Sequence, residues 1–116
     1  MTTTVIRGGR VIDLVEGRDE LADVWMVDGV FSQPTSGPVD RDVNAEGMIV
    51  CPGFIETQAK LQESGWEEGE TIATATAAAV AGGVTSLACL PETVPVVDNR
   101  AAVEFIRRQA ERTGSC

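Results

Sequence analysis

The sequence contains no histidine, and this absence removes several kinds of site at once. A Ser-His-Asp triad needs an imidazole as its general base, so neither Ser64 nor Ser86 is expected to be a catalytic nucleophile. Structural zinc sites are built from cysteine and histidine. The three cysteines, Cys51, Cys89 and Cys116, are far apart and show no Cys-x-x-Cys spacing. The sequence therefore predicts no structural zinc site.

The cysteines are also too few and too scattered for a disulfide framework. Cys51 and Cys89 lie in apolar, strand-like runs. We expect both to be buried, reduced thiols that pack as small apolar side chains. Cys116 ends the sequence and is expected to be exposed.

Positive charge is scarce, with 9 lysines and arginines against 18 aspartates and glutamates, for a net charge of -9. Such a balance repels phosphate backbones and anionic membrane surfaces. No apolar run approaches the roughly 20 residues that span a bilayer. The first ten residues lack the apolar core of a signal peptide. We therefore expect no nucleic-acid partner, no membrane association and a cytoplasmic location.

What is present in residues 1–51 is a series of short β-type runs separated by turn residues. We expect strands near residues 3–7, 10–13, 22–27, 30–33, 41–45 and 48–51. Gly8-Gly9 and Asp28-Gly29 have the composition of tight hairpin turns. Residues 14–21 have the polar character of a surface loop. The first part of the chain is thus predicted to be a β-rich domain portion.

From residue 52 onward the pattern changes to alternating strands and helices. We expect a strand at 53–57, a helix at 71–81, a strand at 84–90 covered on both faces, and a helix at 100–112. This alternation is typical of a parallel α/β fold. The fold class is therefore α/β, with residues 52–116 forming successive βα units.

Polar residues follow both predicted strands of this second part. Gln58, Lys60 and Gln62 are two residues apart, and such residues share a face of a strand. Glu92 lies in a Pro-Glu-Thr turn after the strand at 84–90. The carboxyl ends of parallel strands form the rim where barrel enzymes carry their chemistry.

The stretch PGFIETQAKLQESGWEEGETIATATAAAVAGGVTSLACLPETVPVVDN resembles the start of type I dihydroorotases of the amidohydrolase superfamily, whose pattern is PGxxDxHxHLRxPG, a helix, then GGxTxxxxMPNTxPxxD. The resemblance continues in register over nearly all of the chain. It implies a TIM barrel with a small β-sandwich domain, and zinc-dependent, reversible cyclisation of N-carbamoyl-aspartate in pyrimidine biosynthesis. A whole barrel needs about 250 residues. We therefore expect a front piece, with residues 1–51 a portion of the sandwich and 52–116 the start of the barrel.

The residues that this resemblance assigns to chemistry are all replaced. Its two metal-binding histidines fall on Gln58 and Lys60, its carboxylate-binding arginine on Gln62, and its substrate-binding asparagine on Glu92. Zinc prefers imidazole, thiolate or carboxylate ligands. An amide is a weak ligand, and a lysine places a cation where the metal would be. We therefore expect no catalytic residue and no metal in this chain, and a Lys60–Glu92 ion pair in a partly buried cavity.

Three functions remain open. The first is a non-catalytic dihydroorotase homologue with a scaffold role beside aspartate transcarbamoylase, a partner that the resemblance supplies. The second is an active zinc-dependent dihydroorotase, or a cyclic amidohydrolase of the hydantoinase branch, whose remaining ligands lie beyond residue 116. The third is a fragment that self-associates through exposed strand edges, without a biological role.

Overall fold

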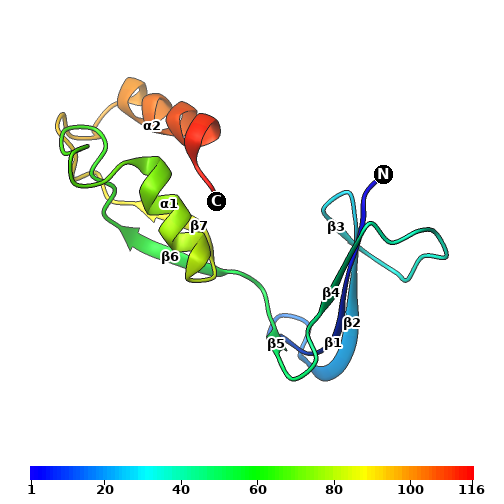
Figure 1. Ribbon diagram of the computed structural model, residues 1–116. Helices are drawn as coiled ribbons and strands as arrows, with labels where there is room; N and C mark the ends of the chain where they lie inside the picture. The colour runs from blue at the N-terminus through cyan, green and yellow to red at the C-terminus, as the bar shows by residue number, and fades with distance from the viewer. The chain divides into compact units, whose positions relative to one another are not determined.

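The computed structural model describes all residues, 1–116, and divides them into two compact units, residues 1–52 and 53–116 (Figure 1). The first unit contains only strands, and the second contains two strands and two helices. Neither helix combines the length and the apolar character that crossing a bilayer requires.

The first unit is a sheet built around β1 (Thr3–Asp13). β2 (Arg18–Val27) pairs with it antiparallel, and β3 (Val30–Ser32) pairs with β2. On its other side β1 pairs in parallel with β4 (Arg41–Asn44) and, further along, with β5 (Ile49–Val50). The long central strand therefore pairs with every other strand of the unit except β3.

The expected hairpin at Gly8-Gly9 is wrong, because β1 runs through both glycines without reversing. Its register with β2 instead shifts between Ile6 and Gly9, and Gly8 has a φ of 68°. This is a β-bulge, which bends a strand but keeps its direction. The chain reverses after β1 instead, so β2 begins at Arg18, within the segment expected to be a loop.

The second expected hairpin is confirmed. β2 and β3 pair on either side of Asp28 and Gly29, whose φ angles are 49° and 80°. Positive φ at both central positions is what a type I′ turn requires, and its twist matches that of the strands.

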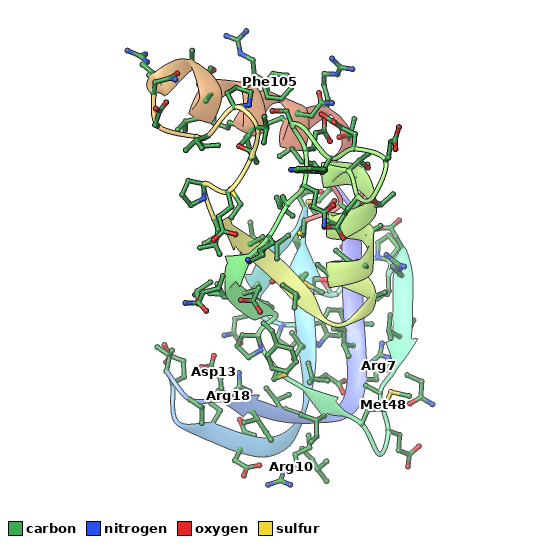
Figure 2. The ribbon with its side chains drawn as sticks, turned by 90° about the vertical axis from the view of Figure 1, so that its left-hand side faces the viewer. Arg7, Arg10, Asp13, Arg18, Met48 and Phe105 are labelled. Atoms are coloured by element: carbon green, nitrogen blue, oxygen red, sulfur yellow. The ribbon has the colours of Figure 1, made fainter.

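Exposed charged side chains form ion pairs on this sheet. Two of the arginines, Arg7 and Arg10, are labelled in Figure 2. The Arg7 guanidinium donates to Asp42 at 2.8 Å and lies 5.5 Å from the ring centre of Trp25. Arg10 donates to both carboxylate oxygens of Asp19, at 2.6 and 2.7 Å. The hydrogen bonds from Arg10 hold the pKa of Asp19 below its usual range.

In the second unit, β6 (Phe54–Ala59) and β7 (Val84–Cys89) are parallel neighbours connected by α1 (Ile72–Ala81). The parallel βα arrangement expected from the sequence is thus present. α1 packs on β7, and α2 (Arg100–Thr113) packs on α1 (Figure 1).

The start of α1 is fixed by a capping box. The Thr71 side chain accepts from the Thr74 N–H at 3.2 Å, and the Thr74 hydroxyl accepts from the Thr71 N–H at 3.0 Å. These bonds satisfy backbone groups that have no partner inside the helix. At the other end, Gly83 follows the helix with a φ of 83°.

Thr71→Ala is expected to destabilise the second unit by about 1 kcal/mol, because alanine leaves a helix N–H without its acceptor. Urea unfolding followed by circular dichroism measures the loss. Thr71→Ser is the matched control, since serine keeps the acceptor oxygen. Equal unfolding midpoints for the alanine and serine variants would contradict the capping assignment.

Burial in the second unit is lower than the sequence suggests. All residues of β7 are exposed or half-buried, whereas coverage on both faces was expected. The reason is that the sheet has two strands and only α1 packs on β7. Cys89, the last residue of that strand, is exposed, and so is Cys51 between β5 and β6. The expectation that these two thiols are buried is therefore wrong.

Candidate functional site

The carboxyl ends of β6 and β7 lie side by side, because the strands are parallel and in register at Ala59 and Cys89. The pairing continues for one more step, since the Leu90 N–H donates to the Ala59 carbonyl at 2.9 Å. Lys60 and Glu92 follow this last bond on their respective segments. Their side chains meet, with Nζ of Lys60 2.8 Å from Oε2 of Glu92. The expected ion pair is present.

The surroundings of this ion pair differ from the expected ones. The Lys60 side chain is 68% exposed and that of Glu92 is 58% exposed, so the pair is not in a partly buried cavity. Exposed ion pairs contribute about 0–1 kcal/mol. The pair therefore shows where the two residues lie and adds little to stability.

The common strand face expected for residues 58, 60 and 62 is not formed. β6 ends at Ala59, and its pairing with β7 is irregular between Glu56 and Ala59. Lys60 and Gln62 therefore lie in the loop that follows. Gln58 is in the strand, and its N–H donates to Glu56 at 2.8 Å.

Gln62 takes no part in the ion pair. Its carbonyl accepts from the Trp66 N–H at 3.0 Å, and its carboxamide lies against Gly69. Neither the Gln58 nor the Gln62 side chain makes a hydrogen bond to Lys60 or Glu92. Of the four positions that the resemblance assigns to chemistry, the structure thus brings Lys60 and Glu92 together and leaves Gln58 and Gln62 apart from them.

The side chains at these strand ends do not fit a zinc ion. Nowhere in the chain do three or more histidine, cysteine, aspartate or glutamate side chains gather to hold a metal. Positions 58, 60 and 92 offer a neutral amide, an ammonium and the carboxylate paired with it. Zinc requires several anionic or imidazole donors at about 2 Å.

Glu63 is a residue of this region that the sequence did not single out. Although it lies in an acidic loop, it is only 7% exposed. Its Oε2 accepts from the N–H of Ile72, the first residue of α1, at 2.8 Å. Its Oε1 accepts from Nε2 of Gln109 in α2 at 2.7 Å. No spacing or motif distinguishes it from the other glutamates of the loop, which are Glu67, Glu68 and Glu70.

The residue after Glu63 connects this loop to the one that carries Glu92. The Val94 N–H donates to the Ser64 carbonyl at 2.9 Å, and the Ser64 hydroxyl donates to the Val94 carbonyl at 3.3 Å. Gly65 follows with a φ of 111°, and its N–H donates to Glu67 at 2.9 Å. That backbone bond lowers the pKa of the Glu67 carboxyl.

An apolar recess of about 400 Å³ lies between this loop contact and α2. Ser64, Thr93 and Pro95 line one part, and Phe105 and Ile106 of α2 line another. Phe105 is labelled on α2 in Figure 2. Neither Lys60 nor Glu92 lines the recess, so the recess is separate from the candidate site at the strand ends.

Comparison with known proteins relates both units to one family. Residues 47–115 match the family described as dihydro-orotase-like. The dihydroorotase of Solibacter usitatus is 45% identical over 109 residues, which are 91% of this chain and 25% of that protein. The dihydroorotase of Geobacter sulfurreducens is 42% identical over 114 residues, which are 95% of this chain and 27% of that protein.

The fold is shared with a solved amidohydrolase. The L-hydantoinase (dihydropyrimidinase) of Arthrobacter aurescens is 21% identical, with a TM-score of 0.78, over 95% of this chain and 25% of the hydantoinase chain. This confirms the expected α/β fold, that of a portion of a TIM-barrel amidohydrolase. The chain spans about a quarter of the length of the curated relatives it matches. The chain belongs to the dihydroorotase-like family.

Proposed function

We propose that this chain is a non-catalytic member of the family, in which the Lys60–Glu92 ion pair replaces the metal site, and that its role is structural. The observation that carries the proposal is the 2.8 Å separation of Nζ of Lys60 and Oε2 of Glu92. The family resemblance assigns a zinc ligand to the first of these positions and a substrate-binding asparagine to the second.

Electrostatics explains why this arrangement opposes metal binding. An ammonium at a ligand position repels a divalent cation, and the repulsion grows as water is excluded. The nearest carboxylate, Glu92, is already paired with that ammonium. Gln58 offers a neutral oxygen in place of an imidazole, which zinc binds more strongly.

Substrate recognition is weakened by the same set of replacements. An arginine binds a carboxylate through two parallel N–H donors, and Gln62 has no such fork. Glu92 adds a negative charge where the family would bind an acidic substrate. The residues that would bind the metal and those that would bind the substrate are thus replaced together. This favours a structural role, in which the protein binds a partner through its surface.

The partner we propose is aspartate transcarbamoylase, in the cytoplasm, with this chain as scaffold. The parallel strands, the βα connection and the β1-centred sheet all persist although the chemical residues are gone. Sedimentation velocity of the chain mixed with the transcarbamoylase of the same organism tests this role. A joint boundary supports it, and two independent boundaries at micromolar concentrations would contradict it.

Metal content tests the inactive site directly. After dialysis against zinc and then against buffer, we expect the protein to retain far less than about one zinc ion per chain, because a stable site needs three or four donors. Elemental analysis by mass spectrometry gives the ratio. A stoichiometric, EDTA-removable zinc ion that is lost in Lys60→Met would refute the proposal.

A second function is favoured by the comparisons. Relatives more than 40% identical are named dihydroorotase, and the chain covers only about a quarter of their length. A longer protein could supply other ligands for an active zinc-dependent amidohydrolase. Zinc-dependent turnover of dihydroorotate by such a protein, absent in a version lacking those ligands, would favour this alternative.

A further inference from the structure

We propose that Glu63 is a positioning residue, which ties the loop after β6 to both helices and so keeps Lys60 within hydrogen-bonding distance of Glu92. The inference rests on the proposed function, because it concerns the ion pair that closes the site. Its experiment measures the geometry of the pair, whereas metal content and partner binding test the function. The two can therefore fail separately.

The two oxygens of Glu63 bind to two different helices. Oε2 accepts from Ile72, whose N–H is among those that have no partner inside α1. A carboxylate is favourable there because the helix dipole is positive at its N-terminus. Oε1 accepts from Gln109, which lies 46 residues further along the chain, in α2. Hydrogen bonds to a charged acceptor are stronger than neutral ones.

The loops on either side of the ion pair are joined twice. Before the pair, the Leu90 N–H donates to Ala59 at 2.9 Å. After it, Ser64 and Val94 exchange two hydrogen bonds. Ser64 directly follows Glu63, so the second junction is anchored to the helices through Glu63.

The ion pair cannot hold these loops by itself. Both of its side chains are more than half exposed, and such pairs are weak because water screens them and their long side chains lose entropy. The hydrogen bonds that join the two loops must therefore keep Lys60 and Glu92 close together. Glu63 is the buried group that connects the loop after β6 to α1 and to α2.

A zero-length carbodiimide cross-link reads the distance directly. The reagent joins an amine to an adjacent carboxylate as an amide, and takes up the released water as a urea. Lys60 is the only lysine of the sequence, so its cross-link to Glu92 is identified without ambiguity by peptide mass spectrometry. The amino group of Met1, 4.0 Å from Asp28 in the other unit, supplies an internal reference cross-link.

Glu63→Ala is expected to lower the ratio of the Lys60–Glu92 to the Met1–Asp28 cross-link about fivefold, the change that about 1 kcal/mol of lost positioning gives. Glu63→Gln should stay within about twofold of wild type, because its amide accepts from Ile72 and pairs with Gln109 once that carboxamide turns over. Glu92→Gln abolishes the cross-link and sets the background.

Circular dichroism separates positioning from plain stability, because each variant is compared at a temperature where it keeps the wild-type helix signal. An unchanged ratio in folded Glu63→Ala would overturn the proposal. So would a ratio in Glu63→Gln as low as in Glu63→Ala. If Glu63→Ala does not fold, Gln109→Leu decides, since it removes the α2 contact and keeps the α1 cap. Its ratio is expected to fall about twofold, and a wild-type ratio would refute the role.

Discussion

Gly65→Ala is expected to destabilise the second unit by about 2–5 kcal/mol, the sum of a positive-φ cost and an overpacking cost. Gly65 has a φ of 111°, which L-residues rarely adopt. A Cβ at this position would lie 2.7 Å from Cβ of Val94 and 2.8 Å from its carbonyl oxygen. Backbone of the neighbouring loop cannot move away without breaking the Ser64–Val94 hydrogen bonds.

Hydrogen exchange measured by mass spectrometry resolves this effect, because it reports on the two units separately. Exchange in α1 and β7 should accelerate, while exchange in β1 and β2 should not change. Gly69→Ala is the matched control in the same loop. Its new methyl group would clash with the end of the Gln62 side chain, which can rotate, and would lie at an ordinary contact distance of 3.5 Å from the Trp66 carbonyl oxygen. Equal protection in the two variants would show that the loop contact is not rigid.

Placing imidazoles at positions 58 and 60, where the resemblance puts metal ligands, is the second change with a large expected effect. In the Gln58→His, Lys60→His double variant we expect about one zinc ion per chain, where the wild-type chain retains almost none. The ammonium that repels a metal is removed, and Glu92 is released as a third donor. Residue 58 is in β6 and residue 60, just after the strand, already reaches Glu92, so imidazoles at these two positions can bind the same ion.

Isothermal titration with zinc measures this gain. The single variant Gln58→His is the control, because it adds an imidazole but keeps the Lys60 ammonium, and it should bind little. A double variant that remains unable to bind zinc would mean that the irregular end of β6 has lost the geometry of a metal site as well as its donors.

The sequence predicted those parts of the fold that short-range signals determine. Asp28-Gly29 defines its hairpin because both residues tolerate positive φ. Asn99 caps α2, accepting from the Ala102 N–H at 3.0 Å, and asparagine is among the residues that helix N-termini prefer. Gly8-Gly9 also has the composition of a hairpin turn, yet it forms a bulge. Its outcome depends on the pairing of β1 with three other strands, which no local pattern contains.

The candidate site was predictable in its composition and only partly in its geometry. Lys60 and Glu92 could be paired in advance, because parallel strands bring their carboxyl ends together and the charges are opposite. The exposure of the pair could not be predicted, because it depends on which parts of the fold surround the strand ends. Glu63 could not be identified either, because its burial follows from the docking of α2, and its partner Gln109 is far away in the sequence.

Lys60 is the only lysine of the sequence, and this allows local unfolding of the segment after β6 to be measured by proteolysis. An endoproteinase that cleaves after lysine has one place to cut this chain, the bond between Lys60 and Leu61. Leu61 is only 8% exposed, so the protease must wait until the segment detaches. The rate of this single cleavage therefore reports the local unfolding of the segment at the end of β6, and no label or substitution is needed to measure it.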